Sequence, residues 1–361
     1  MDKILIYAMS VNNGGVEEYV MNLSRYNLDK ICTYEYIIDG TRTPYEEEMK
    51  SLGLKYYFMP PKNDLIGNIK TMDNLLRERR RDCETIYFNT SGIYYPVPYI
   101  LAEKYKYRII IHSHLTGASG WRILVHKLNR AWIMPFCDKM LACSTPAAEW
   151  MFGKKNLARA TIIPNAINIE RFRFNPSVRE KMRIQLGLEG YFVLGHVGRL
   201  TAVKNQSFLI DILAESRKMG LNYKLLLVGD GEDDHLLKEK AKQSNLMNDI
   251  IFYGNSSKPE ELLSCMDCFV MPSIVEGFPI SLVEAQASGL RCIVSDSITT
   301  EVNLTGDVSY ISIKEPVSKW LKQIRDVESY RNINSPEILY NLGYDLNGLE
   351  RLVWDNIKSQ E

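Results

Sequence analysis

The chain lacks an excess of either charge, since its 361 residues include 44 lysines and arginines and 44 aspartates and glutamates. It therefore gives no argument for the strongly basic surface that nucleic-acid binding needs. No apolar run approaches the roughly 18–20 residues that span a bilayer. Residues 1–7 lead directly into an expected strand and lack the layout of a secretion signal. We therefore expect a cytoplasmic protein with no nucleic-acid partner.

Residue groups that would suggest metal or disulfide chemistry are also missing. No H-x-x-x-H pair or carboxylate set is present, so we expect no metal ion and no bound cofactor. The seven cysteines are odd in number and scattered, which favours reduced thiols. Cys265 and Cys268 form a single C-x-x-C without a second pair or a nearby histidine. We expect structural thiols there, a redox or metal role being the alternative.

The chain does contain short β-branched or aromatic runs that alternate with helical segments, and this pattern occurs twice. Strands separated by helices predict two parallel, doubly wound sheets, whose ligands bind beyond the carboxyl ends of the strands. If the two crevices face each other, one site lies between the domains. The join is expected between Pro164 and Pro176, which gives domains at residues 1–168 and 169–344. The expected strands are residues 3–9, 34–39, 55–59, 85–89, 108–112, 139–144, 161–164, 192–197, 224–228, 250–253, 268–271, 292–295 and 310–313.

The most informative stretch follows the expected strand at residues 268–271. Gly277 and Pro279 break the chain there, and a helical pattern starts near Ser281. A helix that begins just after a parallel strand directs free N–H groups and its positive dipole end at the sheet edge, which makes an anion site. Glu276 in the loop and Glu284 about one turn into the helix bracket that site. A diphosphate there, with a carboxylate for hydroxyl groups on each flank, suits a nucleotide-sugar; an ordinary helix after a glycine turn is the alternative.

Two further loops are candidates for phosphate contacts. Arg199 and Lys204 place two cations in one short loop after the strand at 192–197, which suits a diphosphate leaving group unless they are only surface charges. Gly14 and Gly15 follow the first strand and allow close approach of the backbone to a ligand. They do not form the G-x-G-x-x-G pattern of a dinucleotide site, and a plain strand–helix turn is the alternative.

Two histidines stand at the end of the apolar strand at 108–112. His112 and His114 are placed where an α/β site collects its polar side chains, although histidines satisfied within a loop are the alternative.

An amphipathic helix with a basic flank is expected around residues 121–132. Such a helix could rest on an anionic membrane surface, and packing in the core of the first domain is the alternative. Its apolar positions are Trp121, Leu124, Val125, Leu128 and Trp132, and the basic side chains beside them are Arg122, His126, Lys127 and Arg130.

Taken together, these motifs resemble the retaining GT-B glycosyltransferases of family 4, particularly bacterial capsule and exopolysaccharide enzymes. They follow the family order over nearly the whole chain, and the last of them is the most specific. The matching motifs are Gly14-Gly15-Val16-Glu17, His112, Ile163-Pro164-Asn165, Gly198-Arg199-Leu200 with Lys204-Asn205, Gly229-Asp230-Gly231, and Glu276-x7-Glu284 with Gly277-Phe278-Pro279.

The resemblance implies two Rossmann-like domains facing a cleft, with the acceptor site in the first and the nucleotide-sugar site in the second. It also implies a C-terminal helix, here about residues 345–361, that crosses back to the first domain. The implied activity moves a sugar, from a UDP-sugar by family habit, to a glycan or lipid-linked oligosaccharide in surface polysaccharide synthesis. The implied location is the cytoplasm, with peripheral contact at the inner face of the cell membrane.

By resemblance, individual residues acquire roles. Glu284 would hold the ribose hydroxyls and Glu276 those of the donor sugar. Arg199 and Lys204 would hold the distal phosphate. His112 would lie over the reacting sugar, with His114 as the alternative. The remaining donor contacts would come from Gly14, Gly15, Asn205, Gly229, Tyr253, Gly277, Phe278, Pro279, Ile280 and Ser281.

No carboxylate is placed as a nucleophile, so we expect front-face departure and attack in which the leaving phosphate helps to take the acceptor's proton. No D-x-D triplet stands in a convincing place, which agrees with the metal-independent habit of the fold. Two other functions compete with transfer: another GT-B-fold enzyme such as a sugar-nucleotide epimerase, and a non-catalytic nucleotide-sugar binding module.

Overall fold

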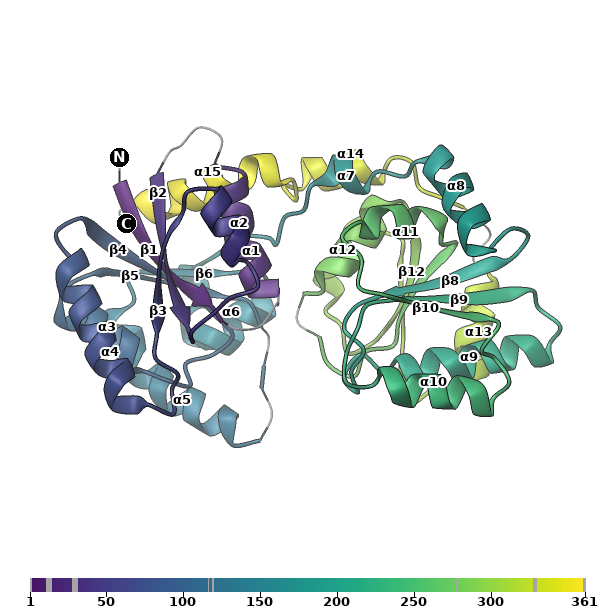
Figure 1. The fold of residues 1–361 in the computed structure, drawn as a ribbon, viewed down its shortest axis with the longest axis horizontal. Helices are drawn as coiled ribbons and strands as arrows, with labels where there is room; N and C mark the ends of the chain where they lie inside the picture. The colour runs from purple at the N-terminus through teal and green to yellow at the C-terminus, as the bar shows by residue number, and fades with distance from the viewer. Residues whose placement is uncertain are drawn as a thin grey trace. The chain divides into compact units, whose positions relative to one another are not determined.

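A computed structural model describes residues 2–10, 15–27, 32–115, 117–118, 120–276, 278–326 and 330–359. The chain divides into two compact units. The first consists of Met1–Ala166 and Leu346–Glu361, and the second is Ile167–Asp345. Each unit contains one sheet of parallel strands with helices around it (Figure 1). The expected fold class, two doubly wound α/β domains, is therefore confirmed.

The first unit is built on a seven-stranded sheet in the order β3-β2-β1-β4-β5-β6-β7. This order reverses between β1 and β4, which places a crevice at the carboxyl ends of these two strands. The strands are β1 (Asp2–Met9), β2 (Cys32–Asp39), β3 (Lys55–Met59), β4 (Cys83–Thr90), β5 (Arg108–Ser113), β6 (Lys139–Ala142) and β7 (Ala160–Ile162). The helices are α1 (Gly15–Arg25), α2 (Glu46–Ser51), α3 (Leu65–Arg79), α4 (Val97–Lys104), α5 (Trp121–Ile133), η1 (Met134–Phe136), α6 (Thr145–Phe152) and η2 (Lys154–Arg159).

The second unit has a six-stranded sheet in the order β10-β9-β8-β11-β12-β13, which reverses between β8 and β11. Its strands are β8 (Phe192–Val197), β9 (Tyr223–Val228), β10 (Ile250–Gly254), β11 (Cys268–Met271), β12 (Arg291–Ser295) and β13 (Val308–Ile311). The helices between Ile169 and the end of the described chain are α7 (Ile169–Phe172), α8 (Pro176–Leu186), α9 (Gln206–Lys218), α10 (Asp234–Gln243), α11 (Pro259–Cys265), α12 (Ile280–Ala287), η3 (Thr300–Val302), α13 (Val317–Arg325), α14 (Ser335–Asn341) and α15 (Leu346–Lys358).

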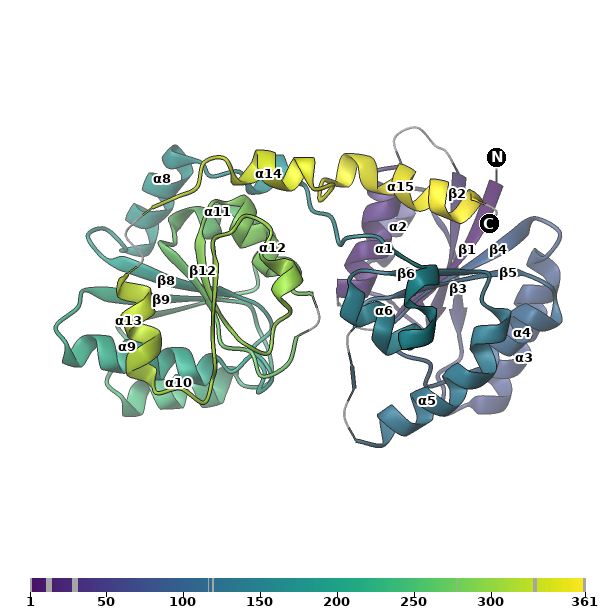
Figure 2. The ribbon, with the colours of Figure 1, turned by 180° about the vertical axis from the view of Figure 1, so that it is seen from behind.

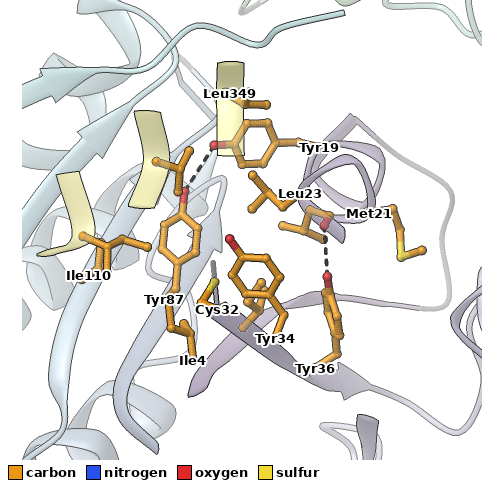
Figure 3. Close-up of a cluster of buried hydrophobic side chains, with 14 of the residues drawn as sticks. Ile4, Tyr19, Met21, Leu23, Cys32, Tyr34, Tyr36, Tyr87, Ile110 and Leu349 are labelled. Atoms are coloured by element: carbon orange, nitrogen blue, oxygen red, sulfur yellow. Dashed lines mark hydrogen bonds between the residues drawn. The ribbon is translucent and has the colours of Figure 1, made fainter. Parts of the chain in front are cut away.

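The last helix, α15, belongs to the first unit although it follows the second unit in the chain. It is the yellow helix beside α1 in Figures 1 and 2. Leu349, Val353 and Ile357 are buried in the same apolar cluster as Tyr19 and Tyr34 of the first unit. Figure 3 shows Leu349 beside Tyr19 in this cluster. The expected return of the C-terminal helix to the first domain is therefore confirmed.

The core of the first unit contains several buried tyrosines whose hydroxyl groups need partners. The Tyr36 hydroxyl donates to the Val20 carbonyl at 3.2 Å, and the hydroxyls of Tyr19 and Tyr87 lie 3.3 Å apart (Figure 3). Tyr87 lies on β4, three residues before the carboxyl end of that strand. The core thus carries a polar connection from α1 toward the site described below.

Two other expectations concern the chemistry of the cysteines and the presence of membrane-spanning helices. All seven cysteines are buried and none is in a disulfide, and burial raises the pKa of the Cys265 thiol to about 11. Among the described residues, no helix is both long enough and apolar enough to cross a membrane.

Candidate active site

In the second unit, the loops that follow β8 and β11 lie against each other because these two strands are neighbours in the sheet. The Ile274 N–H donates to the Val203 carbonyl at 2.8 Å, and the Asn205 amide donates to the Pro272 carbonyl at 3.1 Å. Asn205 has a left-handed backbone, with φ of 56°, at the residue before α9. The expected clamp loop and the expected anion loop are therefore joined at one sheet edge.

Lys204 and Glu276 form an ion pair between these two loops. The Lys204 Nζ lies 2.5 Å from a Glu276 carboxylate oxygen, and the two side chains are 21% and 12% exposed. A partly buried pair of this kind fixes an ammonium group at the crevice, where a developing phosphate charge would compete with the carboxylate for it. The structure thus brings together two residues whose expected ligand groups, phosphate and sugar, are adjacent in a nucleotide-sugar.

Arg199 has a different carboxylate partner in this structure. Its side chain is 69% exposed and lies 3.2 Å from a Glu232 oxygen. Pairs this exposed contribute little to stability, so the guanidinium can be redirected at small cost. The two cations of the expected clamp are therefore one partly buried ammonium group and one exposed guanidinium.

The helix that follows this crevice, α12, begins at Ile280, one residue earlier than the sequence pattern predicted. Pro279 precedes it and provides no side-chain cap, and the first turn holds no acidic residue, so its N–H groups can receive an anion. Ser281 and Glu284 are both partly exposed on this helix. The Phe278 side chain is buried and stacks on Tyr344, with ring centroids 6.0 Å apart.

Gly229 directly follows β9 and allows a second loop to approach the first. A Cβ atom at this position would lie 2.1 Å from the Gly198 carbonyl oxygen, and the backbone φ is 135°. The Gly229 N–H also donates to the Gly254 carbonyl at 2.8 Å. Gly229 therefore packs loop against loop, and Tyr253 lies beside Gly254 at the same edge of the sheet.

His196 is a supporting residue of this site that the sequence did not reveal. The buried ring donates from Nδ1 to the Val270 carbonyl at 2.9 Å, and its Nε2 lies 3.2 Å from the Gln206 amide nitrogen. The same amide donates to the Arg199 carbonyl at 2.9 Å. Burial lowers the pKa of His196 to about 4, so a neutral ring holds the clamp loop in place.

In the first unit, His112 and His114 lie at the carboxyl end of β5. Both rings are buried and their centroids lie 4.2 Å apart. The Tyr87 hydroxyl lies 2.6 Å from His112 Nδ1, and His114 Nε2 lies 3.0 Å from Asn89 Oδ1. Among the described residues, His112 Nε2 and Asn89 Nδ2 have no hydrogen-bond partner. Buried polar atoms of this kind normally have one, so they indicate a ligand-facing edge.

Burial also keeps these two histidines neutral. It lowers the pKa of His112 well below its usual value, with a smaller effect from His114, and it lowers the pKa of His114 to about 3. A neutral imidazole donates or accepts a hydrogen bond but supplies no cation. The rings therefore suit recognition of hydroxyl groups.

Two of the expected ligand contacts, Gly14 and Gly277, lie outside the described residues. Gly15 is the first residue of α1 and is exposed. Among the described residues, no group of three or more histidine, cysteine, aspartate or glutamate side chains could hold a metal ion.

Two protein families match this chain, one over most of each unit. The family described as Glycosyltransferase Family 4 matches residues 13–171, and the family described as Glycosyl transferases group 1 matches residues 178–335. EpsF of Bacillus subtilis (strain 168), whose name places it among glycosyltransferases, is 31% identical over 366 residues. That alignment covers 95% of this chain and 93% of EpsF.

Two other matches are informative. The UDP-Gal:alpha-D-GlcNAc-diphosphoundecaprenol alpha-1,3-galactosyltransferase of Escherichia coli is 31% identical over 275 residues, covering 65% of this chain and 67% of that protein. The Anabaena protein HepE, solved in complex with UDP-glucose, matches with a TM-score of 0.83 at 20% identity. This match covers 100% of both chains and shows a shared fold.

Proposed function

Because the chain belongs to the retaining group 1 glycosyltransferases of family 4, we propose that it moves a hexose from a UDP-sugar to a glycan or a polyprenyl-linked oligosaccharide in surface polysaccharide synthesis. In this proposal the second unit binds the donor and the first unit binds the acceptor. The observation that carries it is the Lys204–Glu276 pair beside the uncapped start of α12.

The donor fits this crevice by charge and by hydrogen bonding. Lys204 and a redirected Arg199 bind the distal phosphate, and the first N–H groups of α12 bind the phosphates from the other side. Glu276 accepts from hydroxyls of the sugar, and Glu284 accepts from those of the ribose. A uridine base is supported by the UDP-glucose complex of HepE and by the UDP-galactose specificity in the name of the E. coli relative.

The rate acceleration follows from where charge develops. Cleavage of the anomeric C–O bond leaves negative charge on the departing phosphate, which Lys204, Arg199 and the helix dipole stabilise. The acceptor oxygen forms its bond on the same face of the sugar, and its proton passes to the leaving phosphate oxygen. His112 donates from Nε2 to a hydroxyl of the reacting sugar while Tyr87 donates to Nδ1, an arrangement that a neutral ring permits.

Peripheral contact with the inner face of the cell membrane is part of the proposal. On α5, Trp121, Leu124, Leu128 and Trp132 are between 59% and 77% exposed. The helix carries basic residues and no acidic ones. An exposed apolar stripe with cationic flanks suits the surface of an anionic bilayer. The diphosphoundecaprenol acceptor in the name of the E. coli relative supports a lipid-linked acceptor.

Donor binding and turnover together test the proposal. UDP-glucose and UDP-galactose are added to the full chain in thermal-shift and hydrolysis assays. We expect one of them to stabilise the fold, by about 2.7 kcal/mol at roughly 100 times its dissociation constant, and to release UDP slowly. Conversion of one sugar into its epimer would instead support an epimerase, and binding without any UDP release would support a non-catalytic module.

A further inference from the structure

We infer that a pocket at the crevice of the first unit binds the terminal sugar of the acceptor, and that it selects a sugar without negative charge. This inference rests on the proposed transferase function and names the chemistry of its acceptor. The pocket has a volume of about 590 Å³ and lies where the strand order reverses, at the carboxyl ends of β1, β2 and β4.

The pocket adjoins the histidine pair. Asn89, the residue that receives the hydrogen bond from His114 at 3.0 Å, is part of the pocket wall. Glu17, near the start of α1, also lines it and accepts from the Ser10 hydroxyl at 2.6 Å. A ligand that contacts Asn89 in the pocket is therefore separated from the histidine pair by one side chain.

Tyrosine rings form the apolar part of the wall and are held in place. The Tyr7 hydroxyl donates to an Asp39 oxygen at 2.7 Å, and the Tyr95 hydroxyl donates to the Asn68 amide oxygen at 3.0 Å. The Tyr94 ring lies over Gly92, where a Cβ atom would come within 2.5 Å of it. Fixed aromatic faces beside fixed polar groups fit a pyranose, which presents C–H groups on its faces and hydroxyls at its edges.

The acidic and basic side chains of the pocket differ in how firmly they are held in position. Glu17 is buried and Asp39 is partly buried, so both carboxylates are fixed in position. Among the described residues of the lining, Lys62 is the one cation. It is 50% exposed, lies 2.8 Å from an Asp39 oxygen and stands over the Tyr95 ring at 5.4 Å. Because Lys62 is already paired with Asp39, the remaining fixed charge is negative. A neutral or amine-bearing sugar is therefore favoured, and a uronate or sugar phosphate is disfavoured.

The wall of the pocket is also attached to α5. The Ile93 N–H donates to His126 Nδ1 at 3.1 Å, and the Asn129 amide donates to the Ile93 carbonyl at 2.9 Å. The Arg122 guanidinium stands 5.7 Å from the centre of the Tyr94 ring. A lipid-linked acceptor can therefore place its sugar in the pocket and its diphosphate outside the pocket, near Arg122 of α5.

The test uses saturation-transfer NMR on the full chain with three probes: methyl α-glucopyranoside, glucosamine and glucuronate. We expect the first two to receive saturation and glucuronate to receive little. Tyr95→Ala should abolish the signals because it removes part of the wall. Asp39→Asn should raise the glucuronate signal by about tenfold, since it removes a carboxylate and frees Lys62 to pair with the ligand.

Two further variants separate charge from folding. Asp73→Asn removes a different aspartate of the first unit, one paired with Lys104 at 2.6 Å outside the pocket, and should behave like the wild type. Lys62→Ala changes an exposed side chain that the fold should tolerate, and it should leave glucuronate excluded.

Three results would overturn the inference: equal contact of glucuronate and glucosamine with the wild type, an unchanged preference in Asp39→Asn, or no contact of any sugar with a protein that binds UDP-glucose. The donor assay is run on the same samples. If UDP-sugars neither bind nor turn over, the proposed function fails, whatever the three sugars do.

Discussion

The Lys204 ammonium group lies 2.5 Å from the Glu276 carboxylate, although the two residues belong to loops that follow different strands. The pair places a cation beside the start of α12, where the proposal puts the leaving phosphate. Lys204→Ala should therefore lower kcat by about 10²–10³-fold, the loss typical of removing one group that stabilises a developing anion.

The measurement is UDP release or sugar transfer at saturating donor, with the midpoint of thermal unfolding as a folding control. Lys238→Ala is the matched variant, because Lys238 is also paired with a carboxylate, that of Asp234 at 2.7 Å, on the exposed face of α10. Full activity of Lys204→Ala would show that the phosphate clamp is wrongly assigned.

The contact between Tyr87 and His112 predicts a change in imidazole chemistry. Tyr87→Phe removes the hydroxyl 2.6 Å from Nδ1, so the proton of the neutral ring is no longer held on Nε2. We expect kcat to fall about tenfold and the ¹⁵N shifts of His112 to move toward a mixture of tautomers. Tyr36→Phe, which removes another buried hydroxyl of the same core, should leave both unchanged. An unaltered His112 spectrum in Tyr87→Phe would contradict the assignment.

The buried histidines predict acid sensitivity. Burial lowers the pKa of His112, His114 and His196 below the value in the unfolded chain, so the unfolded chain binds protons first as the pH falls. Above about pH 6.5 these three histidines do not make the free energy of unfolding depend on pH. Below that pH, each of them can lower the free energy of unfolding by up to about 1.4 kcal/mol per pH unit.

Urea denaturation at pH 7, 6 and 5 measures this loss. His196→Asn should reduce the dependence on pH, because it removes one of the three groups. Ser216→Ala, which changes a buried polar side chain that does not titrate in this range, should keep the wild-type slope. Identical slopes for the two variants would mean that His196 is not held neutral.

The position of α15 predicts that the first unit depends on the end of the chain. Leu349→Ala removes a side chain buried against Tyr19 and should lower the free energy of unfolding by about 2–5 kcal/mol. Leu352→Ala changes an exposed leucine of the same helix and should cost under about 0.5 kcal/mol. Urea titrations of both variants provide the comparison, and equal effects would show that α15 is not part of the core.

The exposed face of α5 predicts binding to anionic vesicles. The double variant Trp121→Ser and Trp132→Ser should sediment about tenfold less with phosphatidylglycerol vesicles, because two interfacial aromatic anchors are lost. Ile66→Ser, at an exposed apolar residue of α3, is the control and should bind like the wild type. Added salt should weaken wild-type binding. Equal binding to neutral phosphatidylcholine vesicles would argue against a role for the basic flanks.

The sequence was sufficient to place the strands and the edge of each sheet that carries polar side chains, but only some of the helices. Ile109, Ile110 and Ile111 predicted a buried strand at residues 108–112, and β5 is Arg108–Ser113. This succeeds because strand patterns are local: a continuous apolar run fits a strand covered on both faces. The reversal points of the two sheets could not be read in the same way, since they depend on strand order.

Contacts between distant loops were beyond the sequence. The pairing of Lys204 with Glu276, and of Tyr87 with His112, depends on which strands are neighbours. Gly229 illustrates a different limit, because a glycine needed for contact with a ligand and one needed for contact with another loop look the same in a sequence. The residues that support His196 carry no motif at all.

The late arrival of α15 has a consequence for how the protein is made. A ribosome produces the strands of the first unit early, but Leu349, Val353 and Ile357 emerge only after the entire second unit has been translated. Until then the apolar cluster around Tyr19 lacks the side chains that α15 supplies, and the uncovered part is open to chaperones and proteases. A prematurely terminated chain would therefore keep a complete second unit and an unfinished first unit, and the exposed apolar surface would mark it for degradation.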